Sequence, residues 1–159
     1  MSEPLTGACA CAETRYQLTS PPMFVHCCHC RDCQRQTGSA FVLNALIEAD
    51  RVRVLAGEPR PDRMPTESAL PHHIFRCARC GVAVWSEYGG RPEVRFVRTG
   101  TLDLPDALAP DVHIYTRSKL PWVVLPPQAT VFTGYYQAKD VWPADRLARR
   151  RAAYAEAGR

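Results

Sequence analysis

The residues best suited to chemistry are eight cysteines, which fall into two sets along the chain. The first set joins a Cys-x-Cys pair near the N-terminus to a later Cys-x-x-Cys pair, and consists of Cys9, Cys11, Cys77 and Cys80. Gly81 follows directly, and a glycine lets the backbone turn tightly under a bound metal. Four thiolates make a closed zinc site, so this set predicts a structural zinc that ties the N-terminus to residue 80.

The second set is a dense run in which four of seven residues are cysteine. The run reads Cys27, Cys28, His29, Cys30, Arg31, Asp32, Cys33. Its best ligand trio is Cys28, Cys30 and Cys33, which joins a Cys-x-Cys to a Cys-x-x-Cys. Catalytic zinc keeps three protein ligands and one open position, so this trio predicts a zinc that can take a substrate.

Other arrangements stay open on sequence alone. The evenly spaced trio Cys27, Cys30 and Cys33 competes with the first one, although the fourth cysteine and the proline of a ferredoxin-type run are missing, which argues against an iron–sulfur cluster. Cys27, His26 or His29 could close the second site and make it purely structural. For the first set the alternative is metal-free thiols, and Cys27 by itself fits a small apolar core residue.

The elements that must position these cysteines are mostly short strands. Apolar or alternating segments, rich in Val, Ile, Phe and Tyr and separated by Gly and Pro, predict a mainly β fold. The expected strands are residues 15–18, 23–27, 41–47, 51–55, 73–77, 82–86, 93–98, 112–116, 122–125 and 129–133. Helices are expected at 32–38 and 144–157, the second flanked by Pro143 and Gly158. Residues 59–71 are the least periodic and are expected to form a loop.

Length and composition limit the class of protein. A chain of 159 residues with 46% hydrophobic and 23% charged residues fits one folded domain over 1–159. No apolar stretch is long enough to span a membrane, and the N-terminus lacks a secretory signal, so a cytoplasmic location is the default expectation. In a reducing compartment, clustered cysteines hold metal more often than they form disulfides.

The formal net charge is +4, and much of it comes from arginines near the C-terminus, such as Arg146 and those at 149–151. A basic helix face is a weak signal for nucleic acid, because ordinary solvation explains it equally well. The segment also lacks the interleaved aromatic residues that stack on bases, so nucleic acid is the last-ranked partner. His72, His73 and His113 are expected to be ordinary strand or surface histidines rather than ligands.

Several motifs occur together in a fixed order. They are GACAC at 7–11, CHCRDC at 28–33 followed by QRQTGSAF, FRCARCG at 75–81, RTGTLD at 98–103, and HI at 113–114 through SK to Trp122. Together they resemble the glutathione-dependent formaldehyde-activating enzyme family, which is related to centromere protein V. The resemblance covers about residues 7–133 and leaves out the helical extension at 143–158. One departure is Ala12, where such proteins usually have glycine.

The resemblance implies a β-tent fold of short antiparallel strands with two zinc ions per chain. The structural zinc would take Cys9, Cys11, Cys77 and Cys80, and the catalytic-type zinc would take Cys28, Cys30 and Cys33. The family's named reaction joins glutathione and formaldehyde to S-hydroxymethylglutathione. The implied activity is therefore that of a carbon–sulfur lyase, with a small thiol, glutathione among the candidates, and an aldehyde as partners.

An open zinc position suits such a reaction, because zinc deprotonates a bound thiol and the thiolate can add to the aldehyde carbon. Three thiolates make the site negative, so nearby donors must offset that charge. Candidate donors that closely follow the ligands are Arg31, Arg35, Thr37 and Ser39, and Arg98, His113 and Lys119 could face an anionic substrate. The alternative is a non-catalytic zinc-scaffolded binding or chaperone module, in which both zincs would be saturated.

Overall fold

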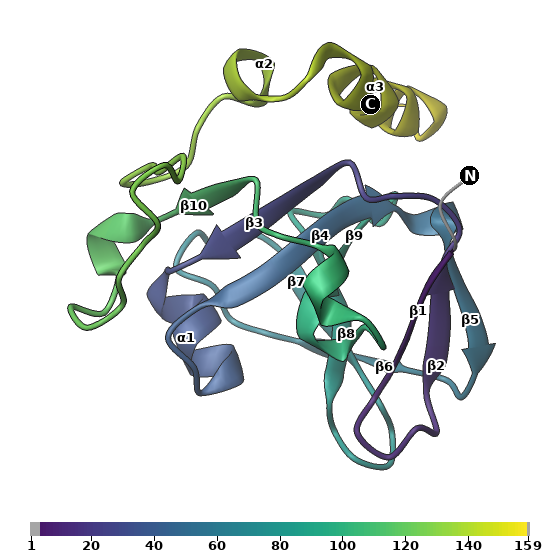
Figure 1. Cartoon of the computed structure of the whole chain (residues 1–159). Helices are drawn as coiled ribbons and strands as arrows, with labels where there is room; N and C mark the ends of the chain where they lie inside the picture. The colour runs from purple at the N-terminus through teal and green to yellow at the C-terminus, as the bar shows by residue number, and fades with distance from the viewer. Residues whose placement is uncertain (1–3, 159) are drawn as a thin grey trace.

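The computed structural model describes residues 4–158, which form two β-sheets and three α-helices (Figure 1). The larger sheet has seven strands in the order β10-β3-β4-β9-β8-β7-β6, and the smaller has three in the order β1-β2-β5. The larger sheet contains β3 (Phe24–Cys28), β4 (Val42–Glu48), β6 (Arg60–Arg63), β7 (His72–Arg76), β8 (Ala83–Tyr88), β9 (Val94–Arg98) and β10 (Val112–Ile114). The smaller contains β1 (Leu5–Ala8), β2 (Arg15–Leu18) and β5 (Val52–Ala56).

The helices are α1 (Arg31–Thr37), α2 (Ala138–Val141) and α3 (Ala144–Glu156), and 3-10 turns occupy Ala49–Arg51, Thr99–Thr101, Pro105–Ala107 and Thr116–Ser118. Helix α1 ends where Gly38 adopts the left-handed conformation and its N–H bonds to the Gln34 carbonyl. A glycine in that place avoids the Cβ clash of other residues, which explains why the helix stops one residue before it.

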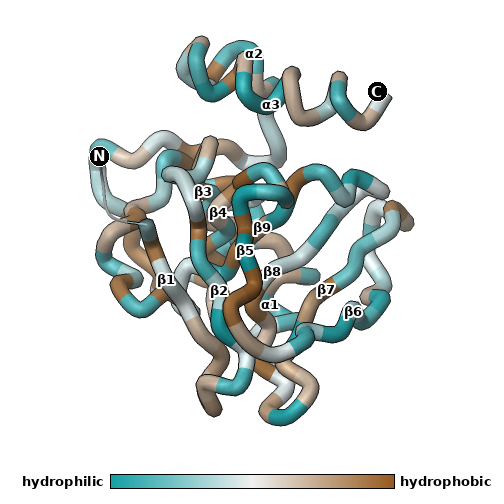
Figure 2. Tube along the Cα trace, turned by 90° about the vertical axis from the view of Figure 1, so that its right-hand side faces the viewer, coloured by the Kyte–Doolittle hydropathy of each residue, from teal (hydrophilic) through white to brown (hydrophobic). Residues whose placement is uncertain are grey.

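Strand β4 lies between two hydrophobic clusters and is buried on both faces. Ala45 and Ile47 pack toward the smaller sheet, where the Tyr16 and Trp85 rings meet edge to face at 5.8 Å. Leu46 points the other way because side chains alternate along a strand. Figure 2 shows hydrophobic residues along several core strands and mainly hydrophilic residues along β6.

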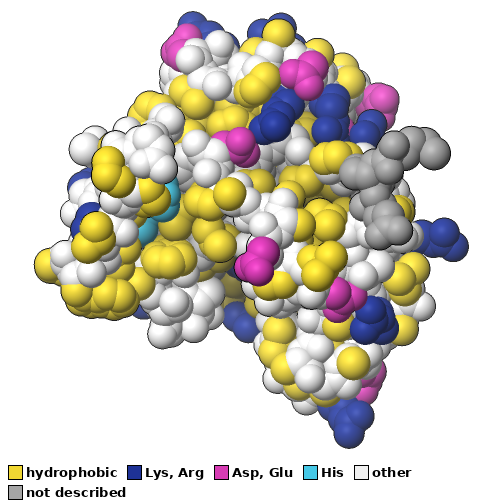
Figure 3. Space-filling view, viewed as in Figure 1, with side chains coloured by type: hydrophobic (Ala, Val, Ile, Leu, Met, Phe, Trp, Pro, Cys, Tyr) yellow, Lys and Arg dark blue, Asp and Glu magenta, His cyan; other side chains and the backbone are white. Residues whose placement is uncertain are grey.

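The second cluster is completed by the C-terminal segment, whose helices α2 and α3 lie over one side of the sheets (Figure 1). The Trp142 ring stacks on Phe24 with centroids 4.7 Å apart. Arg149 holds the Glu48 carboxylate through two hydrogen bonds of 2.7 and 2.9 Å. Figure 3 shows basic and acidic side chains interleaved over this end of the molecule, so the arginines of α3 do not form an unbroken basic surface on the face shown.

The mainly β fold and the short C-terminal helix are confirmed, with α1 and α3 within a residue of their predicted bounds. Two predicted strands, 122–125 and 129–133, are wrong. Prolines flank the first, and Trp122 and Val124 are exposed; in the second, Val131 makes a single bridge to His113. The predicted loop at 59–71 contains β6, an edge strand whose exposed, charged residues show no apolar pattern. One strand pair departs from the antiparallel expectation, because β10 runs parallel to β3.

Within residues 4–158, no helix is both long enough and apolar enough to cross a membrane.

Candidate active site and metal centres

The dense cysteine run is divided by the alternation of side chains along β3. Cys27 and Cys28 are neighbours in this strand, so their side chains point to opposite faces of the sheet. Cys28 shares its side with Cys30 and Cys33, and the three sulfurs lie within 4.8 Å of one another. Cys30 is the N-cap of α1, where its sulfur accepts a hydrogen bond from the Cys33 N–H at 3.3 Å. The structure thus brings together the predicted trio and places Cys27 apart from it.

The three sulfurs perturb one another strongly. Hydrogen bonds from Cys30 and Cys33, together with burial, raise the pKa of Cys28 far above the ordinary value of a thiol. The pKa of Cys30 is lowered, because hydrogen bonds from Cys28 and Cys33 stabilise its thiolate. Three thiols that compete for protons in this way can all become thiolates once a cation lies between them. The donor set therefore fits zinc, which favours thiolate ligands.

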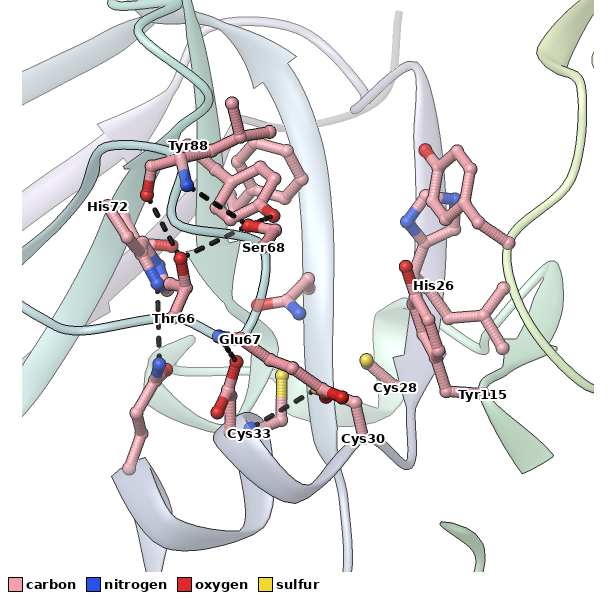
Figure 4. A pocket seen from close by; sticks show the side chains of 18 of the residues that line it. His26, Cys28, Cys30, Cys33, Thr66, Glu67, Ser68, His72, Tyr88 and Tyr115 are labelled. Carbon is pink, nitrogen blue, oxygen red and sulfur yellow. Dashed lines mark hydrogen bonds between the residues drawn. The ribbon is translucent and has the colours of Figure 1, made fainter. Parts of the chain in front are cut away.

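The trio opens into a cavity of about 680 Å³. Figure 4 shows the three cysteines at one end of this cavity, with His72, Tyr88 and the segment around Ser68 across from them. That segment is held in place at two points. The Ser68 and Tyr88 hydroxyls are hydrogen-bonded at 2.6 Å, and the Glu67 N–H donates to the Asp32 carboxylate of α1 at 3.0 Å. Because Cys28, Cys30 and Cys33 line this cavity, a small molecule bound in it would reach their sulfurs directly.

Cationic side chains outnumber acidic ones on the cavity wall. Its arginines are Arg31, Arg91, Arg98, Arg117 and Arg150, against two acidic residues, Asp32 and Glu67. Arg98, on β9, is the most deeply placed, since only 7% of it is exposed. One guanidinium nitrogen donates to the Asn44 side chain, and Nε has no hydrogen-bond partner among the described residues. Burial lowers the pKa of Arg98, while the nearby Cys33 sulfur favours its charged form.

Some of the predicted donors lie elsewhere. Arg35, Thr37 and Ser39 are exposed and do not line the cavity, because the outer face of α1 and the turn after it carry them into solvent. The Lys119 ammonium donates to the backbone carbonyls of Leu120 and Val123, the latter at 2.6 Å. Of the expected contacts, Arg31 and Arg98 do face the cavity.

The first cysteine set forms a compact cluster outside the cavity. Sulfur–sulfur distances are 3.5 Å between Cys9 and Cys11 and 3.7 Å between Cys11 and Cys77. Zinc–sulfur bonds of about 2.3 Å in a tetrahedron give an edge of about 3.8 Å, so the spacing fits one ion. Gly81 supplies the turn after Cys80, with φ +73° and an N–H bonded to the Cys77 carbonyl at 2.9 Å.

The matching turn after the first pair is made by Ala12, which adopts φ +58°. Its N–H donates to the Cys9 carbonyl at 3.0 Å. An L-residue in the left-handed region carries a steric cost that glycine does not. The left-handed turn after the first cysteine pair is therefore made here by alanine at that cost.

Residues 4–118 match the family model of the glutathione-dependent formaldehyde-activating enzymes. The chain belongs to this family. No curated protein matches it significantly. Among solved structures, the crystal structure of a Rhodobacter sphaeroides protein is similar, with a TM-score of 0.48 and 20% sequence identity over 62% of this chain and 87% of that one.

The family match ends at residue 118, yet the cavity of this family member does not. Tyr135 and Arg150, from the C-terminal segment, also line it. The Trp142 indole donates to the Tyr136 hydroxyl at 2.7 Å. Since indole N–H is donor only, Tyr136 must donate its own proton to His26 Nε2, 2.6 Å away. This chain of bonds fastens the C-terminal wall to β3, and burial lowers the pKa of His26 to about 3, which keeps it neutral.

Sequence reasoning missed this wall because the C-terminal segment lies outside the resemblance and its helix looks like an ordinary solvated one. A weak signal was available in its tryptophan and adjacent tyrosines, which are costly to expose. His113 lies in a strand, β10, as expected, but it does not face the cavity, so the alternative that it faces an anionic substrate is not met. The structure buries it within 4.8 Å of Cys27 and His29, away from the cavity.

Proposed function

We propose that this family member is a carbon–sulfur lyase of the S-(hydroxymethyl)glutathione synthase type, which joins or cleaves a thiol and a small aldehyde. The proposal places the reaction at Cys28, Cys30 and Cys33. The observation that supports it most is the convergence of three sulfurs at the end of an open, arginine-rich cavity. A purely structural site does not need a cavity of that size beside it.

Two zinc ions per chain belong to the proposal, one for each cysteine cluster. Zinc bound by the cavity trio would supply a Lewis-acidic centre at which a substrate thiol is held as its thiolate. Arg98 has the role of offsetting negative charge, because its buried guanidinium lies near the Cys33 and Cys28 sulfurs. Three thiolates donate negative charge to a bound zinc and so reduce its Lewis acidity. A buried positive charge beside them offsets part of that negative charge.

The cavity wall supports a substrate thiol that carries carboxylates, as glutathione does. Guanidinium groups bind carboxylates through paired hydrogen bonds. Arg91, Arg117 and Arg150 also line the cavity, so they could bind a carboxylate while the thiol reaches the cysteines. A volume of about 680 Å³ lies in the range of sites for ligands of that size. Formaldehyde, the aldehyde in the family's name, needs little further space.

The test is the rate of exchange between glutathione and formaldehyde, measured by NMR, because the unassisted addition supplies a defined background. We expect the protein to accelerate exchange and Cys28→Ala to return it to the background rate. Cys27→Ala is the matched control, since it removes the adjacent cysteine from the opposite face of β3 and should leave the acceleration in place. Tight glutathione binding without acceleration would instead favour the non-catalytic binding module.

A further inference from the structure

A second group of metal-binding side chains lies on the other face of the same run. Cys27 and His29 are two residues apart, so an extended chain places both side chains on the face opposite Cys28. Strand β10 pairs with β3 in parallel, and its register sets His113 directly opposite Cys27. The His29 N–H bonds to the Ile114 carbonyl at 3.0 Å, which continues the pairing past the end of β3. Three ligand side chains are thus gathered by backbone geometry alone.

The distances within the group lie close to those between ligands of one metal ion, with the nitrogen–nitrogen distance slightly shorter. His29 Nε2 lies 3.1 Å from His113 Nδ1 and 3.5 Å from the Cys27 sulfur. Metal bonds of about 2.0 Å to nitrogen and 2.3 Å to sulfur place neighbouring ligand atoms roughly 3.3 to 3.7 Å apart. All three residues are buried, with exposed fractions of 1% for Cys27, 0% for His29 and 8% for His113.

Hydrogen bonding alone leaves this group poorly satisfied. Each imidazole nitrogen carries either one proton or one in-plane lone pair. A hydrogen bond between His29 Nε2 and His113 Nδ1 therefore uses the one proton or lone pair that each atom offers. The Cys27 thiol also contacts His29 Nε2, so it has to share that nitrogen. An ion at the centre would instead receive one electron pair from each residue. Ligation through Nε2 would leave the His29 proton on Nδ1, which has no hydrogen-bond partner among the described residues.

Charge decides which ion suits the group. One thiolate and two neutral imidazoles carry a single negative charge, and no carboxylate belongs to the cluster. Lys119 adds a positive charge close enough to act on His29. A divalent ion would leave the buried cluster itself positive next to Lys119, which is costly, whereas a monovalent ion leaves the cluster of three ligands neutral. Soft thiolate and imidazole ligands in a three-coordinate set suit Cu(I).

We propose that Cys27, His29 and His113 form a third metal site, separate from both cysteine clusters, which binds a monovalent thiophilic ion of the Cu(I) class. The site shares strand β3 with the cavity trio but none of its ligands. It does not depend on the lyase function, because its residues face away from the cavity. Its cysteine also explains why the run contains one more thiol than the two clusters use.

The test starts from full-length, zinc-loaded protein without oxygen. One equivalent of Cu(I) is added as its acetonitrile complex, and bound metals are counted after gel filtration. We expect about one copper per chain with the zinc count unchanged, and a copper X-ray absorption spectrum that reports two nitrogen ligands and one sulfur ligand. Cys27→Ser and His113→Ala should each abolish copper retention while keeping the zinc. His73→Ala, a histidine on β7 outside all three groups, is the control and should retain the copper.

Copper that displaces zinc and shows sulfur ligands only would overturn the proposal, as would equal copper retention in Cys27→Ser. A third zinc in the wild type that is absent from Cys27→Ser would keep the site and overturn the choice of a monovalent ion. Zinc counts and circular dichroism of each variant show whether it has folded, so loss of copper is read only from folded protein.

Discussion

The two cysteine clusters use the same ligand chemistry in different surroundings. Cys9, Cys11, Cys77 and Cys80 bring four sulfurs from two turns far apart in sequence, and none of them lines the cavity. The trio of β3 and α1 brings three sulfurs from one short segment, and all three line the cavity. The first arrangement would enclose an ion in four protein ligands and cross-link the fold, whereas the second would leave one coordination position free.

Cysteine spacing therefore predicts which residues could form a metal site, but it does not distinguish a closed structural site from one that can take a substrate. What separates the clusters is a fourth sulfur in one case and a cavity with a buried arginine in the other. Removing a ligand from the closed cluster should therefore damage the fold, and changing the wall of the open one should damage activity alone.

The largest expected effect is on stability, from Cys77→Ser. Loss of one of four ligands should release the structural metal and lower the Tm by more than about 10 °C, because metal binding of this kind contributes directly to folding free energy. Cys30→Ala, in the open cluster, is the comparison and should lower the Tm much less. Calorimetry with metal analysis measures both. Equal losses of Tm would show that the two clusters do not differ in role.

The next effect is on activity, from Arg98→Gln. Removing the buried cation should lower kcat/KM about 10- to 100-fold, the range seen when residues that support metal ligands are lost. Arg98→Lys keeps the charge and should recover part of the rate. Arg95→Gln on the same strand is the control, since Arg95 lies over Trp85 and does not line the cavity. Equal values of kcat/KM for Arg98→Gln and Arg95→Gln would show that Arg98 does not support the reaction.

A smaller effect concerns the C-terminal wall. Burial alone would raise the pKa of Glu48, but the Arg149 hydrogen bonds hold it below its ordinary value of 4.5. A carboxyl whose pKa is lowered on folding stabilises the protein above its unfolded pKa, and this is lost as the pH falls through the folded pKa. Arg149→Ala should cost about 1 to 2 kcal/mol at pH 7, and this cost should shrink as the pH falls through the folded pKa of Glu48.

Denaturant unfolding at several pH values measures this difference. Arg151→Ala, an exposed change on the same helix, is the control and should show no pH-dependent gap from the wild type. A gap for Arg149→Ala that persists unchanged at low pH would mean that packing, and not the ion pair, fastens α3.

The smallest effect is a gain. Ala12→Gly should stabilise the zinc-loaded protein by about 0.5 to 1 kcal/mol, because the left-handed turn beside Cys11 costs alanine more than glycine, less the extra freedom that glycine gives the unfolded chain. Ala10→Gly, in the same turn but without a positive φ, should not stabilise. The measurement is the free energy of unfolding of Ala12→Gly and of Ala10→Gly. Equal values for the two variants would mean that the turn at Ala12 is not strained.

Local signals in the sequence were enough to find both cysteine clusters and most strands, because ligand spacing and apolar alternation act over a few residues. The features that were missed depend on distant pairing. His113 reaches Cys27 only through the parallel register of β10 with β3, which no local pattern encodes. The stack of Trp142 on Phe24 is likewise formed by the returning chain. Strand β6 exists because β7 offers it an edge, not because of its own residues.

The central claim is that the cluster at the cavity has an exchangeable position and the other does not. Replacing zinc with cobalt makes both sites visible, and glutathione is then titrated in while the absorption spectrum is recorded. With an exchangeable position at this cluster, we expect a saturable change in the cobalt bands that disappears in Cys28→Ala and persists in Cys27→Ala. A spectrum that glutathione leaves unchanged, in protein shown to hold cobalt at the Cys28, Cys30 and Cys33 cluster, would contradict it.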